Sequence, residues 1–189
     1  MRRRQRQMCI RDRYKDSVQT ILDEKIVQID GPFDRYGNSS NSGNLGMLIT
    51  KTMYDFAVSK GLTNVIAVHN KGGVRADLIK SSYPDYVTYE DIYSVSPFDN
   101  TVRYVTLPGD RVSSAITNHF FYPSSENLNI DNNKEYNIVT IDFLTTTPGY
   151  PLYEEDGGKY IDGETLYIRD LLSSELKKLN SISTSDYPF

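Results

Sequence analysis

Four residues just after the apolar run NVIAVH have types and a spacing suited to binding an anionic ligand. The stretch reads HNKGGVRAD, and within it stand Asn70, Gly72, Gly73 and Arg75. Consecutive glycines permit backbone conformations that side chains exclude, and they let a ligand approach the main chain. An amide can donate and accept hydrogen bonds, and arginine offers an anion a planar pair of donors. The alternative is a plain turn in which Arg75 pairs with Asp77 or another surface acid.

Two further segments offer aromatic and amide side chains close to the ends of predicted elements. Phe98 and Asn100 lie in SPFDNT, and Phe143 lies in DFLTTTPGY. Two facing aromatic rings can hold a flat heterocycle by stacking, which contributes about 1–3 kcal/mol per base. Each residue also has a structural alternative, because both phenylalanines can pack in the core and Asn100 can stabilise a turn.

The sequence offers no recognisable catalytic machinery. Neither of its two histidines, His69 and His119, lies in a D-x-H, N-H-D/E or G-H-x-H stretch that would support a two-metal phosphatase site. A G-x-S-x-G elbow and a Ser-His-Asp constellation are also absent. We therefore expect no metal site and no catalytic residue in this chain, with both histidines as packed or surface side chains.

Charge is distributed unevenly along the 189 residues. Residues 1–13 contain six Arg and one Asp, a net charge of +5, whereas the remaining 176 residues carry 15 of the 21 basic and 24 of the 25 acidic side chains, a net charge of −9. An acidic body argues against a nucleic-acid polymer as partner. The basic head could bind nucleic acid or an anionic membrane. Its sequence RQRQMCIRDR, however, resembles translated sequencing-adapter sequence, so we expect residues 1–13 to be a non-native head, as in a metagenomic fragment. No stretch has the length and apolarity of a membrane span.

The hydrophobic periodicity alternates between helix and strand. Helices are predicted over residues 14–24, 44–61, 88–97, 109–121 and 165–179. Strands are predicted over residues 25–30, 64–69, 101–109 and 136–144. The longest helix has one apolar face, formed by Leu45, Leu48, Ile49, Met53, Phe56 and Ala57. This alternation predicts an α/β domain with a mixed sheet and flanking helices, in which a ligand binds at loops leaving the carboxyl ends of strands.

Five segments, in order, resemble the C-terminal domain of the 5'-nucleotidase family. They read NLGMLI, HNKGGVRAD, VTYEDIYSVSPFDNT, LPGDRV and DFL, where the family usually has NLGNLI, NGGGIRAD, ITYGDVY with LPFGN, ELTG and NDFLASGGDGY. The resemblance runs from about the middle of the loop before Asn44 to Tyr150. It implies that residues 14–30 are the end of an interdomain helix with a lead-in strand, and that residues 31–189 form a single domain of the 5'-nucleotidase C-terminal type.

The resemblance also implies roles for individual residues. Asn70 matches an Asn that contacts the base, and Arg75 matches an Arg that contacts phosphate. Phe98 and Phe143 match two aromatics that sandwich the base. Asn100 stands at the Asn of the LPFGN-type motif and is expected to face the ligand.

Three of the departures from the family pattern concern the expected binding residues. Gly72 and Gly73, which are expected to make room for the nucleotide, remain from a glycine triple whose first position is Lys71 here. Ser39 stands where a second phosphate-contacting Arg is usual, and Arg35 lies four residues earlier. TTTPGY replaces GGDGY, so the Asp that binds the ribose hydroxyls in the family has no counterpart in this stretch.

The resemblance implies a nucleotide-binding domain of a 5'-nucleotidase-like, metal-dependent phosphoric ester hydrolase of nucleotide catabolism, truncated before its metallophosphatase domain. That N-terminal domain would hold a pair of divalent metal ions, and the lone chain is expected to be inactive. The expected ligand is a nucleoside monophosphate or related nucleotide, and the expected location is extracytoplasmic: periplasmic, secreted or at the cell surface. Two alternatives stay open: a stand-alone, non-catalytic nucleoside- or nucleotide-binding module, and a scaffold that has lost its ligand.

Overall fold

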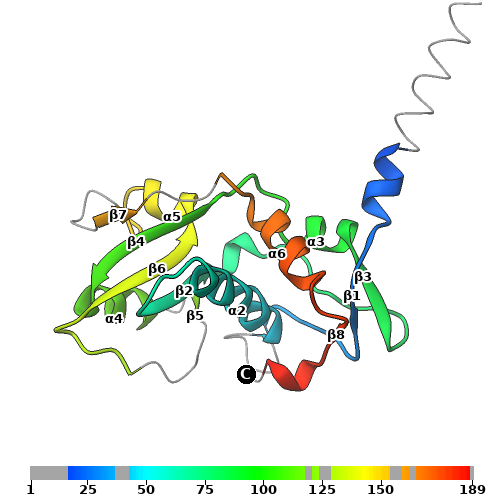
Figure 1. The fold of residues 1–189 in the computed structure, drawn as a ribbon, viewed down its shortest axis with the longest axis horizontal. Helices are drawn as coiled ribbons and strands as arrows, with labels where there is room; N and C mark the ends of the chain where they lie inside the picture. Colours follow the sequence, from blue (N-terminus) through cyan, green and yellow to red (C-terminus); the bar gives the residue numbers. More distant parts are fainter. Residues whose placement is uncertain are drawn as a thin grey trace, which may run out of the picture.

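The computed structural model describes residues 17–36, 43–117, 121–123, 129–153, 159–161 and 165–187, which form two mixed sheets with helices packed around them (Figure 1). The larger sheet has the strand order β5-β2-β6-β4-β7. Its strands are β2 (Val65–Asn70), β4 (Val102–Pro108), β5 (Phe121–Pro123), β6 (Glu135–Ile141) and β7 (Lys159–Ile161). The smaller sheet has the order β3-β1-β8. Its strands are β1 (Lys25–Ile29), β3 (Asp85–Thr88) and β8 (Ser181–Ile182).

The helices connect and cover these sheets. The α-helices are α2 (Asn44–Ser59), α3 (Tyr89–Val95), α4 (Gly109–Thr117), α5 (Asp142–Thr146) and α6 (Ile168–Leu176), and the short 3-10 helices are η2 (Lys71–Gly73) and η4 (Thr184–Asp186). Residues 17–22 are also helical and extend away from the sheets at the upper right of Figure 1, with Val18 and Ile21 more than half exposed. None of the helices in the described residues is long and apolar enough to cross a membrane.

Strand directions in the larger sheet bring three loops to one edge. β2 is parallel to β6, so both strands have their carboxyl ends, Asn70 and Ile141, at the same edge. β4 is antiparallel to β6 and begins at this edge, where Val102 pairs with Ile141. The loop after β2, the loop before β4 and the start of α5 after β6 therefore lie together. These are the three segments in which the sequence placed the candidate binding residues.

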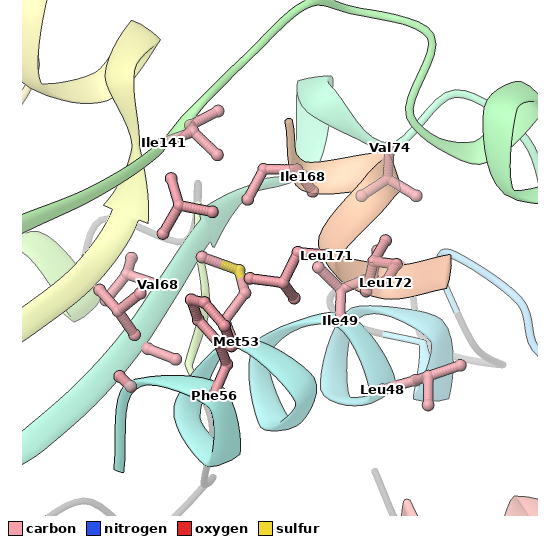
Figure 2. Packing of buried hydrophobic residues seen from close by; sticks show 14 of the residues in the cluster. Leu48, Ile49, Met53, Phe56, Val68, Val74, Ile141, Ile168, Leu171 and Leu172 are labelled. Atoms are coloured by element: carbon pink, nitrogen blue, oxygen red, sulfur yellow. The ribbon is translucent and has the colours of Figure 1, made fainter. Parts of the chain in front are cut away.

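The apolar face of α2 packs against the larger sheet and α6. All six residues predicted to form this face are buried: Leu45, Leu48, Ile49, Met53, Phe56 and Ala57. Figure 2 shows Met53 pointing toward Val68 of β2, and Ile49 pointing toward Leu171 of α6. Burial of one such aliphatic side chain stabilises the fold by about 1.5–3 kcal/mol, so this face fixes α2 and α6 firmly to the sheet.

Two predicted elements end early and are followed by a different element than expected. The strand predicted over residues 136–144 ends at Ile141, where α5 begins, and the Oγ1 atoms of Thr145 and Thr146 donate hydrogen bonds to the Asp142 carbonyl oxygen within this helix. The helix predicted over residues 109–121 ends at Thr117, and Phe121 instead pairs with Asn70 in the antiparallel β5–β2 ladder. The predictions also missed β3, β5, β7 and β8, which are two to four residues long and too short to show a clear alternation.

Candidate functional site

The predicted binding loop begins where β2 gives way to the short helix η2. Neither Gly72 nor Gly73 has a positive φ, so the loop does not require glycine for its backbone conformation. Close packing requires it at one position instead: a Cβ on Gly73 would lie 2.6 Å from Cε1 of His69 and 2.7 Å from Oδ1 of Asn70. A Cβ on Gly72 would meet only Nδ2 of Asn70, at the ordinary distance of 3.6 Å. Gly73 is therefore the glycine that the loop geometry demands.

His69 supports this loop from beneath. Its side chain is 1% exposed, and its Nδ1 lies 2.9 Å from the carbonyl oxygen of Asn70, to which it donates. Burial lowers the pKa of His69 to about 4, although the hydrogen bond to Asn70 opposes this effect. The ring is therefore neutral at pH 7 and serves as a packed structural side chain, one of the two roles expected for it. His119 lies outside the described residues.

Phe98 is carried by the loop that follows α3. A capping box begins this helix: Oγ1 of Thr88 accepts from the Asp91 backbone N–H, and the Asp91 carboxylate accepts from the Thr88 N–H at 2.7 Å. Pro97 follows the helix, and the Phe98 side chain beyond it is 44% exposed. A core role for Phe98 is therefore excluded by its exposure.

Phe143 reaches the same region from the first turn of α5. Its side chain is 39% exposed, so it too is not a core residue. The adjacent Asp142 carboxylate accepts a hydrogen bond from Oγ1 of Thr101 at 3.0 Å, and Thr101 lies in the loop that carries Phe98. This contact links the two segments on which the exposed rings are mounted.

Six of the seven predicted site residues line one cavity of about 250 Å³. The lining residues are Asn70, Gly72, Gly73, Phe98, Asn100, Phe143 and Tyr150. The cavity is slightly smaller than most small-molecule sites, which begin at about 300 Å³. Its wall combines three aromatic rings with two amides and a glycine backbone, a composition suited to a flat, polar-edged ring system.

Tyr150 is the lining residue that the sequence analysis did not select. Its ring packs edge-on against Phe143, with centroids 5.2 Å apart and an interplanar angle of 67°. It follows Gly149, which adopts φ +87°, a conformation that favours glycine. The Pro-Gly pair in TTTPGY was the available signal, because it indicates a turn just before Tyr150.

The Asn70 side chain presents a polar atom without a partner. Its Oδ1 is buried and accepts no hydrogen bond from the described residues. A buried polar atom left without a partner costs about 1–3 kcal/mol, so this atom would gain from a hydrogen bond with a ligand that reached it.

Arg75 is the predicted site residue that does not line the cavity, but it contacts two residues that do. Its Cζ lies 5.8 Å from the centroid of Phe98, and its Nη1 donates to the carbonyl oxygen of Gly72 at 3.4 Å. The alternative pairing with Asp77 is not observed, because Asp77 pairs with Nε of Arg35 at 3.1 Å. Nη1 of Arg35 also donates to the carbonyl oxygen of Arg75 at 3.1 Å.

Arg35 therefore stands next to Arg75 in space, although its sequence position did not match a family motif. Ser39, which occupies the usual motif position, lies outside the described residues. Within the described residues, no group of three or more His, Cys, Asp or Glu side chains is placed to hold a metal ion.

The chain is similar in sequence and in fold to known proteins. A 5'-nucleotidase of Vibrio parahaemolyticus is 26% identical over 199 residues, which cover 92% of this chain and 34% of that protein. Among solved structures, the chain superposes on a 5'-nucleotidase precursor of Thermus thermophilus with a TM-score of 0.73 at 22% identity, covering 89% of this chain and 39% of the other. It superposes on the NAD nucleotidase of Haemophilus influenzae with a TM-score of 0.68 at 19% identity, covering 92% and 38%.

These structural likenesses establish a shared fold, and the chain spans about a third of the length of the Vibrio protein. The family described as "5'-nucleotidase, C-terminal domain" matches residues 25–128, which is more than half of the chain. The chain therefore belongs to the family of 5'-nucleotidase C-terminal domains.

Proposed function

We propose that this domain binds a nucleotide, with the base held between Phe98 and Phe143. The observation that carries the proposal is that two half-exposed rings, from segments more than 40 residues apart, line one cavity. Exposed aromatic rings are unfavourable in water, and stacking on a flat heterocycle would cover both faces. Tyr150, which packs edge-on against Phe143, would help to hold that ring in place.

Hydrogen bonds in the cavity would orient the base. Oδ1 of Asn70 would accept from an N–H group on the base edge, because it lacks a partner among the described residues. Asn100 would face the ligand from the loop that carries Phe98. Gly72 and Gly73 would leave the space that the ligand needs beside the end of β2.

Arg75 would receive the phosphate at the side of the cavity. Its guanidinium lies beside Phe98, so a phosphate attached through a sugar to a stacked base would be within its reach. Arg35 would strengthen this end of the site, because it holds the Arg75 backbone and adds a second cation.

In the intact protein, the domain would present the nucleotide to a metallophosphatase domain, as in a 5'-nucleotidase-like hydrolase of nucleotide catabolism. Relatives that match this chain are named 5'-nucleotidase and NAD 5'-nucleotidase. The described residues do not fit a metal pair, so no hydrolytic step is derived from them. We expect the lone chain to bind without turnover, and the intact protein to work outside the cytoplasm.

Calorimetric titration of adenosine monophosphate into the chain tests this proposal. Phe98→Leu and Phe143→Leu each remove one ring, so each should weaken binding by roughly 5- to 150-fold, the equivalent of about 1–3 kcal/mol of stacking. Tyr86→Leu is the matched control, because Tyr86 lies on β3, outside the cavity lining, and is 39% exposed, like Phe143. Equal affinity for all four proteins would contradict the base-stacking proposal.

A further inference from the structure

The segment that carries Phe98 and Asn100 connects α3 to β4 and belongs to neither sheet. A half-exposed ring on such a segment can stack on a base only if the backbone beneath it is held in place, because ordering it at the moment of binding weakens the affinity. The residues that hold this backbone come from the start of α6, about 70 positions later in the chain.

Arg169 makes the principal contacts. Its Nη1 donates to the carbonyl oxygen of Phe98 at 2.9 Å, and its Nη2 donates to Oδ1 of Asp99 at 2.6 Å. The Arg169 side chain is only 11% exposed, whereas that of Asp99 is 74% exposed. Solvent therefore screens the ion pair with Asp99, and the better-protected contact is the one to the Phe98 backbone.

Two tyrosines restrict the Arg169 guanidinium further. Its Cζ lies 4.6 Å from the ring centroid of Tyr167 and 5.3 Å from that of Tyr93. Tyr93 belongs to α3, the helix that leads into the Phe98 segment. Arg169 therefore connects α6, α3 and the segment between α3 and β4.

The helix that carries Arg169 is itself anchored in the core. Ile168, Leu171 and Leu172 are buried, and Figure 2 shows them within the cluster formed with α2. The backbone N–H of Ile168 donates to the carbonyl oxygen of Asn100 at 3.0 Å. The start of α6 thus forms hydrogen bonds with the backbone of both cavity residues. Phe98 is bound by the Arg169 side chain, and Asn100 is bound by the backbone N–H of Ile168.

We propose that Arg169 is a positioning residue that pre-organises Phe98 for stacking on the base. It does not line the cavity and acts through the Phe98 backbone, so this inference rests on the proposed nucleotide-binding function. Arginine suits this role because its planar fork binds two acceptors while its faces contact the tyrosines. Lysine carries a compact ammonium group on a flexible stem, so it lacks the fixed planar fork and the flat faces that contact the tyrosines.

The test uses the whole chain labelled with 4-fluorophenylalanine, in which seven phenylalanines report separately by fluorine NMR. The Phe98→Leu variant identifies the Phe98 signal. The compared variants are Arg169→Met, Arg169→Lys and, as control, Lys177→Met. Lys177 directly follows α6 and pairs with Glu24 at 2.6 Å, away from the cavity.

Without ligand, we expect Arg169→Met to move or broaden the Phe98 signal while the signal of the fully buried Phe33 stays in place. If the binding-competent arrangement of Phe98 falls to about a tenth of molecules, the Kd for adenosine rises about tenfold. Arg169→Lys should show both effects to a smaller extent. Lys177→Met should leave the Phe98 signal and the Kd within twofold of the unmodified chain.

The ligand-free spectra separate this inference from the proposed function. If the unmodified chain binds neither adenosine monophosphate nor adenosine, the proposed function fails, and the Phe98 signal alone then decides whether Arg169 orders the ring. An unchanged Phe98 signal in Arg169→Met would overturn the inference. Collapse of all seven signals toward one position in both Arg169 variants, with the Lys177→Met spectrum intact, would also overturn it, because Arg169 would then be required for folding as a whole.

Discussion

Replacing Gly73 with alanine tests the packing beneath the cavity. The new Cβ would lie 2.6 Å from Cε1 of His69, about 1 Å closer than an ordinary contact, and 2.7 Å from Oδ1 of Asn70. The Asn70 amide can rotate away, but the fully buried His69 ring cannot move without displacing the core. Overpacking of this kind destabilises a protein by about 1–3 kcal/mol.

The matched variant is Gly72→Ala, whose Cβ meets only Nδ2 of Asn70 at 3.6 Å. Gly72 has no positive φ, so alanine there should be neutral or should stabilise the fold by about 0.4–1 kcal/mol through the unfolded chain. Thermal unfolding followed by circular dichroism should give a Tm for Gly73→Ala about 2–12 °C below the unmodified value, at about 2–4 °C per kcal/mol for a chain of this size. Gly72→Ala should not lower the Tm.

A second substitution identifies the cause of the lower stability of Gly73→Ala. His69→Ala removes the ring that the new Cβ would strike, so its destabilisation and that of Gly73→Ala should sum to more than that of the double variant. Equal Tm values for the two glycine variants, or strict additivity of Gly73→Ala with His69→Ala, would refute the packing argument.

Three further predictions concern pH, helix capping and phosphate binding. Because burial lowers the pKa of His69 to about 4 from an unfolded value of 6.5, the unfolded state binds more protons between these values. The free energy of unfolding should therefore fall by about 3 kcal/mol at most as the pH drops from 6.5 toward 4. Urea unfolding at each pH measures this fall, and the part contributed by His69 should be absent in His69→Ala. Thr88→Ala removes the side-chain cap of α3 and should lower the free energy of unfolding by about 1 kcal/mol, and an unchanged urea midpoint would count against the capping box. Arg35→Met removes the contact to the Arg75 carbonyl oxygen. Calorimetry should then show a smaller difference between the Kd for adenosine monophosphate and the Kd for adenosine. The control Lys51→Met, on an exposed face of α2, should leave this difference unchanged.

The main elements could be predicted because their periodicity reflects burial. The α2 face and the apolar β2 strand are buried as their residue patterns indicate. Phe143 was assigned to a strand because it continues the apolar run of β6, whereas in the structure α5 begins at Asp142 and ends that strand. Strands of two to four residues depend on tertiary pairing and leave almost no periodic signal.

Some residues of the candidate site could likewise be predicted from the sequence, and others could not. Asn70, Phe98 and Phe143 lie at the ends of elements within recognisable motifs, so sequence reasoning could select them. Arg169 could not be selected, because its contacts to the Phe98 segment join residues about 70 positions apart and belong to no local pattern. Arg35 was similarly hidden, since its neighbour Arg75 lies 40 positions further along the chain.

The central claim is that a nucleotide base lies between Phe98 and Phe143, and intermolecular nuclear Overhauser effects test it most directly. With adenosine monophosphate bound to the chain, the account predicts effects from the H2 and H8 protons of the base to the ring protons of both phenylalanines. It also predicts effects to Tyr150, which packs edge-on against Phe143. Contacts from the base to other aromatic residues, such as Tyr86 or Tyr167, with none to Phe98 and Phe143, would contradict the account.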